Sequence, residues 1–171
     1  MSNLVNGLSV QLGWWVSILA AVAGHPEIGP PVVLILIALH LVKTGDKRRE
    51  LATVAVLGLV GTAADTLQMK LGLLTFVTPT EVLCPLWITA LWLHFAITPR
   101  ASLAFLRRRP LLAAGLGSLA GPAAYFAGSR LGAVSFAPQA AWSLLSLALV
   151  WALVLPAMMW FSWRGSADAA E

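Results

Sequence analysis

A few polar side chains that could carry out chemistry interrupt the long apolar runs of this sequence. Asp65 is the only acidic residue well inside such a run, and His40 and His94 stand in two others. A carboxylate and imidazoles can transfer protons or bind metal ions when their segments converge. Ser17 and Tyr125 add hydroxyl groups. These five residues are the candidates for a polar site, and the segments that carry them decide whether they meet.

Asp65 has both a structural and a functional interpretation. In a bilayer a carboxylate costs about 2.5 to 3.5 kcal/mol, so it should be paired, neutralised or in contact with water. A hydrogen bond from Tyr125 or Ser17 that fixes the helix bundle is the structural interpretation, which we favour. Coupling to ions, protons or a substrate is the second interpretation, and catalysis is the third.

Neither histidine has a third metal ligand at a recognisable spacing. We therefore expect His40 and His94 to make interhelical hydrogen bonds, and we expect neither a metal ion nor another cofactor. The sequence also lacks the motifs of a catalytic serine, a phosphate-binding loop or a zinc protease, and its single Cys84 cannot form an internal disulfide. These absences favour a protein that is not an enzyme. Acid–base work by Asp65 with the histidines stays open.

The composition indicates that these residues lie in a membrane. Of 171 residues, 59% are hydrophobic and 11% are charged, and the mean hydropathy is +0.84. An ordinary soluble domain has about 25% charged residues. A soluble domain of this size could not bury so many apolar side chains. The net charge of +4 does not indicate nucleic acid as a partner, because the basic residues form short clusters between apolar runs.

We expect an all-α, polytopic bundle of six transmembrane helices in a single membrane domain, residues 1–171. The apolar segments are residues 4–23, 28–42, 51–67 or a turn beyond, 82–98, 110–128 and 142–163. A span needs about 20 apolar residues. Because the second segment is shorter than this, a re-entrant hairpin of the first two segments is an alternative. Signal-peptide cleavage near residues 21–23 is disfavoured, since no basic residue precedes the first apolar run.

The distribution of basic residues predicts the orientation of the bundle. The loops 43–50 and 99–109 and a short tail, 164–171, hold nine of the eleven Lys and Arg residues, all on one side of a six-span bundle. Lys70 and Arg130 would form a rim on the outer side. This asymmetry predicts an inner-membrane protein with both chain ends, and therefore the tail, in the cytoplasm.

An internal repeat divides the segments into three helical hairpins, residues 1–42, 49–98 and 109–163. Residues 59–76 match residues 119–136 at an offset of 60, with seven identities in eighteen positions. A weaker third copy precedes them at an offset of 48. A repeat of this length predicts that one structural unit, a helical hairpin, occurs three times.

The repeat gives Ser17, Asp65 and Tyr125 equivalent positions on helix faces that are rich in small residues. Such faces allow close helix packing in lipid, where no hydrophobic drive brings helices together. We therefore expect the first, third and fifth helices to pack through matching glycines. These glycines are Gly13, Gly24, Gly61, Gly72, Gly121 and Gly132.

Short motifs over most of the chain are similar to those of a known family. They are Gln11–Trp14, Gly61–Asp65 with Gly72, Pro85–Trp87, and Gly121–Pro122 with Tyr125 and Leu131–Ala133. In these motifs the chain resembles DUF2878, a family of small bacterial membrane proteins of unknown function. The resemblance implies a bacterial inner-membrane protein whose relatives look to be encoded near lipid-modifying enzymes. It implies no catalytic residue.

The sequence favours a non-enzymatic bundle that binds, transports or presents a hydrophobic or lipid-derived small molecule. Its glycine-rich repeat, its tryptophans deep in the apolar segments and its scarcity of reactive groups support this hypothesis. A membrane-embedded enzyme that acts on lipid is the second hypothesis. A scaffold subunit whose basic loops dock a soluble lipid-modifying enzyme is the third. The expected partners are the lipid bilayer, a lipid or hydrophobic ligand and, for the third hypothesis, that soluble enzyme.

Overall fold

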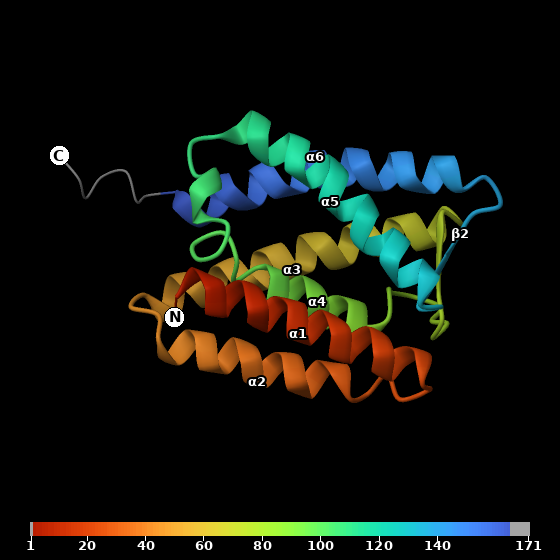
Figure 1. Ribbon diagram of the computed structural model, residues 1–171, viewed down its shortest axis with the longest axis horizontal. Helices are drawn as coiled ribbons and strands as arrows, with labels where there is room; N and C mark the ends of the chain where they lie inside the picture. Colours follow the sequence, from red (N-terminus) through yellow and green to blue (C-terminus); the bar gives the residue numbers. More distant parts are fainter. Residues whose placement is uncertain (1, 165–171) are drawn as a thin grey trace.

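The computed structural model describes residues 2–164, which fold into six α-helices and a two-stranded sheet (Figure 1). The helices are α1 (Asn3–Val22), α2 (Gly29–Val42), α3 (Lys47–Lys70), α4 (Leu86–Phe95), α5 (Pro110–Arg130) and α6 (Ala140–Trp163), and a short 3-10 helix, η1 (Ala104–Leu106), precedes α5. The predicted number of six helices is confirmed for the described part of the chain. Of the predicted tail, only Arg164 belongs to that part.

Local sequence signals set the starts of these helices. The Ser2 hydroxyl accepts a hydrogen bond from the backbone N–H of Val5 at the start of α1, at 3.3 Å. The Asp46 carboxylate accepts one from the backbone N–H of Arg49 at the start of α3, at 3.0 Å. Both side chains thus satisfy a backbone donor that the helix itself leaves free. Proline stands in the first turn of α2 and α5, where its missing N–H costs nothing.

The helices α1, α3 and α5 all end at a glycine with a left-handed backbone conformation. The φ angle is 85° at Gly24, 69° at Gly72 and 87° at Gly132. At each end the N–H groups of the glycine and of the next residue bond back to carbonyls of the last turn, as in a Schellman motif. The prediction that these three glycines pack helices together is wrong, because a Cβ at any of them would meet no atom within 4 Å. Their shared role is to end a helix.

Four helices, α1, α3, α5 and α6, are long and apolar enough to cross a membrane, whereas α2 and α4 are shorter. The predicted span 82–98 is wrong in extent, since α4 has only 10 residues, about 15 Å of helix. It starts after Pro85 and stops before Pro99. The helical conformation is disfavoured for the residue immediately before a proline, which limits how far α4 can extend. Residues 96–99 are nevertheless buried.

The helices pack in sequential pairs, with α1 along α2, α3 along α4 and α5 along α6, and α4 also packs against α1 and α2 (Figure 1). These pairs follow the three predicted hairpins, and whether the hairpins superpose stays a prediction. The strands β1 (Leu74–Phe76) and β2 (Val134–Phe136) pair antiparallel and join the end of α3 to the end of α5. Sequence analysis did not predict these strands.

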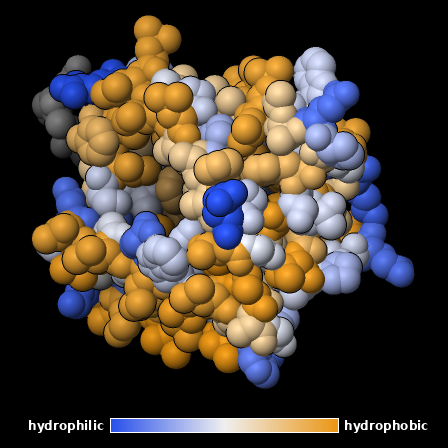
Figure 2. All heavy atoms as spheres, turned by 45° about the vertical axis from the view of Figure 1, so that its right-hand side comes forward, coloured by the Kyte–Doolittle hydropathy of each residue, from blue (hydrophilic) through white to orange (hydrophobic). Residues whose placement is uncertain are grey.

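Apolar side chains cover much of the outer surface. Leu4 in α1, Leu59 in α3, Leu119 in α5 and Leu153 in α6 are each more than 70% exposed. Figure 2 shows hydrophobic residues over most of one face, with hydrophilic residues between and beside them. An apolar exterior of this extent is expected where the surroundings are lipid rather than water.

Both ends of the helical region lie at the same end of the bundle. In Figure 1, α1 begins and α6 ends on the left, where the loop between α2 and α3 also lies. The sheet of β1 and β2 lies at the opposite end. We call these the loop end and the sheet end.

Candidate functional site

The carboxylate of Asp65 is fully buried and is held by side chains from three helices. Its Oδ2 accepts a hydrogen bond from Nε1 of Trp92 in α4, at 2.7 Å, and another from the hydroxyl of Tyr125 in α5. Its Oδ1 accepts one from the amide of Gln68, one turn along α3, at 3.3 Å. Three donors therefore replace the water that a carboxylate needs, and they do so without a cation. The structure brings together Asp65 and Tyr125, as sequence analysis expected.

This hydrogen-bond network extends to α6. The Ser146 hydroxyl donates to Oε1 of Gln68, at 3.0 Å, and the Ser143 hydroxyl donates to the carbonyl of Leu73, at 2.6 Å. The four helices α3 to α6 are therefore joined by polar contacts within their apolar interior. Sequence analysis did not identify the indole N–H of Trp92 as a donor to Asp65.

Ser17 lies away from this network. It is buried in α1 against Gly29 of α2, and a Cβ on that glycine would come within 2.7 Å of the Ser17 hydroxyl. This hydroxyl has no hydrogen-bond partner among residues 2–164. Of the two predicted partners of Asp65, the structure therefore provides Tyr125 and not Ser17.

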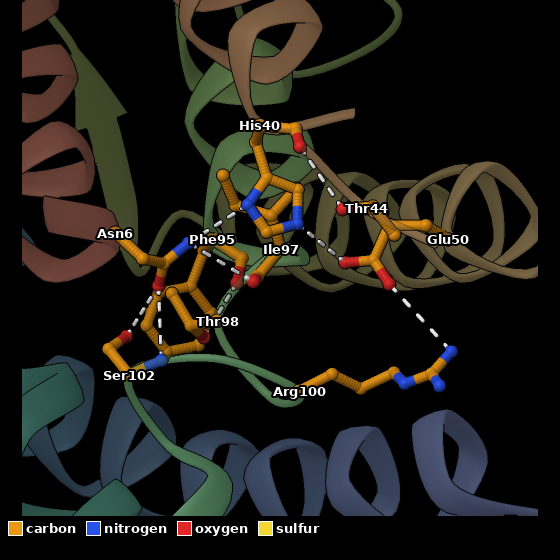
Figure 3. Close-up of polar contacts among 9 residues, drawn as sticks. All are labelled: Asn6, His40, Thr44, Glu50, Phe95, Ile97, Thr98, Arg100 and Ser102. Atoms are coloured by element: carbon orange, nitrogen blue, oxygen red, sulfur yellow. Dashed lines mark hydrogen bonds and ion pairs between the residues drawn. The ribbon is translucent and has the colours of Figure 1, made fainter. Parts of the chain in front are cut away.

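His40 belongs to a separate buried cluster at the loop end, shown in Figure 3. Its Nε2 lies 3.0 Å from Oε1 of Glu50, and Oε2 of Glu50 lies 3.9 Å from Nη1 of Arg100. Glu50 is 2% exposed. The cluster connects the end of α2, the start of α3 and the segment that follows α4.

Asn6 of α1 completes this cluster (Figure 3). Its amide nitrogen donates to the carbonyl of Ile97, at 3.3 Å, and lies 3.5 Å from Nδ1 of His40. Its Oδ1 accepts from the backbone N–H and the hydroxyl of Ser102, at 3.2 and 2.7 Å. These contacts are all satisfied when His40 carries its proton on Nε2 and donates it to Glu50. Sequence analysis missed this cluster, although Asn6 inside an apolar run was a usable signal.

A cavity of about 580 Å³ lies between α1, α4, α5 and α6. Aromatic rings form much of its wall, among them Trp14, Trp87, Trp92, Phe95, Tyr125 and Trp151. Two of these residues, Trp92 and Tyr125, are also donors to Asp65, so the carboxylate lies directly behind the wall. Within the described chain, none of the lining residues is Asp, Glu, Lys or Arg.

His94 lines this cavity and is the second histidine of the predicted site. It is fully buried, and neither ring nitrogen has a hydrogen-bond partner in the described part of the chain, so the interhelical hydrogen bond predicted for His94 is wrong. The Nε1 of Trp151, in the same wall, is also buried without a partner there. Buried polar groups are nearly always hydrogen-bonded in folded proteins. The wall therefore holds unsatisfied polar groups from two residues.

Three of the predicted packing glycines make room for rings of this wall. A Cβ on Gly13 would overlap the ring of His94, one on Gly61 the ring of Trp92, and one on Gly121 the ring of Trp151. The prediction that the first, third and fifth helices pack on one another through these glycines is wrong. Each glycine instead receives a ring from α4 or α6, because removal of one Cβ leaves space for a flat side chain.

The predicted rim residues lie at the sheet end, where α3 and α5 end. Both Lys70 and Arg130 are exposed. The Lys70 amino group contacts the carbonyl oxygen of Glu81. Among residues 2–164, no group of three His, Cys, Asp or Glu side chains could hold a metal ion.

Four helices long and apolar enough to cross a membrane, an apolar exterior and buried polar networks place the chain in the class of polytopic α-helical membrane proteins. Within this class, the chain belongs to the DUF2878 family. The model of this family, described as a protein of unknown function, matches residues 3–157. The resemblance seen in the short motifs is thereby confirmed. Comparisons with curated proteins and with solved structures found no match.

Proposed function

We propose that this protein binds a hydrophobic or lipid-derived small molecule in the cavity between α1, α4, α5 and α6, and holds or presents it in the membrane. The cavity itself carries the proposal. Its volume of about 580 Å³ falls in the range of roughly 300 to 1,000 Å³ that small-molecule sites have. Its wall consists mainly of apolar and aromatic side chains, which favour an apolar ligand through burial of surface.

Access from the bilayer supports this function. Two lining residues, Trp15 and Leu116, are 44% and 37% exposed, so the cavity reaches the lateral surface of the bundle. Leu12 of α1 and Leu119 of α5 are also exposed apolar side chains. A ligand dissolved in lipid would enter sideways between α1 and α5 without crossing water.

We place the loop end in the cytoplasm and the protein in the bacterial inner membrane. The guanidinium of Arg107 lies 4.1 Å from the ring centroid of Trp163, and that of Arg164 lies 4.4 Å from the ring of Trp160. Tryptophan and arginine together are typical of a membrane–water interface, and an excess of basic residues favours the cytoplasmic side. This basic end also supports the docking of a soluble lipid-modifying enzyme as a second, additional role.

The structure gives less support to an enzyme. Catalysis by Asp65 with a histidine would require the two to meet, yet the hydrogen bonds to Asp65 come from Trp92, Tyr125 and Gln68. His40 is bonded to Glu50 at the loop end. The binding function needs no such convergence, so we favour it.

Analysis of co-purified molecules tests the proposed function. Ala124→Phe would fill the cavity, because Ala124 lines it, whereas the adjacent Ala123 is exposed and does not. After purification in a mild detergent, wild type and Ala123→Phe should retain the same lipid-soluble compound, as detected by mass spectrometry of organic extracts. Ala124→Phe should retain much less of it. Equal extracts from all three proteins would contradict the proposal.

A further inference from the structure

The polar groups in the cavity wall indicate what kind of ligand it takes. His94 and Trp151 are the lining residues whose buried side-chain nitrogens have no partner in the described chain. A neutral imidazole offers one donor and one acceptor, and an indole offers one donor. Leaving a buried donor or acceptor unsatisfied is energetically costly. A purely hydrocarbon ligand would leave that cost in place, whereas an oxygen on the ligand would remove part of it.

The absence of charge in the same wall limits the ligand further. No lining residue in the described part of the chain is Asp, Glu, Lys or Arg. The carboxylate of Asp65 lies behind Trp92 and Tyr125, and its oxygens are already used by donors. An anionic or cationic group in this cavity would therefore be desolvated without a counter-charge, which is strongly unfavourable.

We infer that the ligand is an uncharged lipid bearing a carbonyl or hydroxyl oxygen that hydrogen-bonds to His94, with Trp151 as a second donor in the wall. This inference rests on the proposed binding function and specifies its ligand. His94 is held for this role by Gly13, whose missing side chain leaves space for the imidazole between α1 and α4. A carbonyl would accept a bond from His94, and a hydroxyl could also donate one.

Infrared spectroscopy with a labelled probe tests the contact directly. The probe is dodecan-2-one with an isotope-labelled carbonyl, added to the full chain in lipid nanodiscs. A hydrogen bond lowers the C=O stretching frequency relative to the same ketone free in the bilayer. The difference between wild type and the cavity-filled Ala124→Phe isolates the bound fraction. Wild type should show a shifted band, and it should bind the ketone about fivefold more tightly than dodecane, as one neutral hydrogen bond implies.

Variants of the two wall residues identify the donor. His94→Leu should lose most of the shifted band and bring the ketone affinity close to that of dodecane, while His94→Gln, with an amide donor and acceptor, should keep part of both. Trp151→Phe retains a ring that can stack on Trp92 and removes only the N–H, so it should reduce the shift. If His94→Leu does not fold, as judged by circular dichroism and elution as a single species, Trp151→Phe and His94→Gln decide the question.

The outcomes separate this inference from the proposed function. Equal binding of dodecan-2-one and dodecane without a shifted band would overturn the inference and leave the binding function intact. A shifted band that survives unchanged in both His94→Leu and Trp151→Phe would also overturn it. Tighter binding of dodecanoate than of the ketone would show that the ligand is anionic. If wild type and Ala124→Phe bind all three probes equally, the proposed function fails and the inference fails with it.

Discussion

Nε1 of Trp92 lies 2.7 Å from Oδ2 of Asp65, so a ring of the cavity wall is hydrogen-bonded to the buried carboxylate behind it. The same ring stacks on that of Trp151 in α6, with the ring centroids 4.7 Å apart. The network around Asp65 and the wall of the cavity therefore form one structural unit. A change at Asp65 should disturb both the stability of the bundle and the shape of the cavity.

Substitution of Asp65 distinguishes polar bonding from apolar packing. Asp65→Asn keeps one oxygen for Trp92 and Tyr125, and its new NH₂ can donate to Gln68 if that amide turns and donates to Ser146. We expect it to lower the free energy of unfolding by about 1 kcal/mol. Asp65→Leu leaves three buried donors without an acceptor and should cost several times more. Thermal unfolding in detergent measures both, and equal melting temperatures for wild type and Asp65→Leu would refute a structural role.

The donors to Asp65 should depend on each other. Tyr125→Phe removes the hydroxyl that binds Oδ2 of Asp65 without opening a cavity, and should cost about 1 kcal/mol. Trp92→Phe should cost more, since it also removes part of a ring packed on Trp151 and Gly61. Because both donors share one oxygen, loss of one lets the other bind that oxygen more strongly, so the double variant should be more destabilised than the sum of the two. Strict additivity in a double-mutant cycle would indicate that the bonds are independent.

The sequence predicts the helices well because apolar runs, prolines and charged loops mark most of their positions. The Asp65–Tyr125 contact was also predictable, since the repeat gives both residues the same position at an offset of 60. The short α4 was not, because its apolar pattern continues beyond the helix into buried, non-helical residues 96–99. The apolar pattern of a helix does not indicate which backbone structure follows where the helix ends.

The cluster at the loop end shows a different limit of prediction from sequence. Its partners are up to 96 residues apart, as in the bond from Ser102 to Asn6. Glu50 follows basic residues in a segment that the sequence predicts as a loop, where a solvated side chain is the ordinary interpretation, yet it begins α3 and is buried against His40. The burial of Glu50 depends on the packing of α1, α2 and α3, and no local sequence pattern predicts that packing. The same holds for β1 and β2, whose three residues each are too few for a strand signal.

Glycines that face rings should not tolerate even a methyl group. A Cβ on Gly121 would overlap the ring of Trp151, and one on Gly61 would overlap the ring of Trp92. We expect Gly121→Ala and Gly61→Ala to destabilise the protein by about 1 to 3 kcal/mol through overpacking. Gly115 in α5 is the matched control, because a Cβ there meets nothing within 4 Å. Gly115→Ala should be neutral or stabilising, as in an open helix position. Thermal unfolding measures the three variants, and a Gly115→Ala melting temperature as low as those of Gly121→Ala and Gly61→Ala would contradict the prediction.

Glu50 should be important for stability although it stands beside basic residues in the first turn of α3. Glu50→Gln weakens the contact with Arg100, which is partly exposed, and can keep a hydrogen bond to His40. Glu50→Ala removes both contacts and should lower the free energy of unfolding by about 1 to 3 kcal/mol more than Glu50→Gln. Glu81→Ala, at an exposed acidic residue, serves as the control and should change little. If Glu50→Ala and Glu81→Ala melt alike, the buried cluster contributes nothing to stability.

Labelling of single cysteines tests the orientation that places the loop end in the cytoplasm. The native Cys84 is buried and is replaced by alanine, and new cysteines are introduced one at a time at exposed positions. Gly45→Cys and Phe105→Cys probe the loop end, and Val82→Cys probes the loop between β1 and α4. With an impermeant maleimide on intact spheroplasts, only Val82→Cys should be labelled, and the other two should react after the membrane is permeabilised. Labelling of Gly45→Cys or Phe105→Cys from outside would contradict the predicted orientation. The excess of basic residues would then face the periplasm, which the positive-inside rule disfavours.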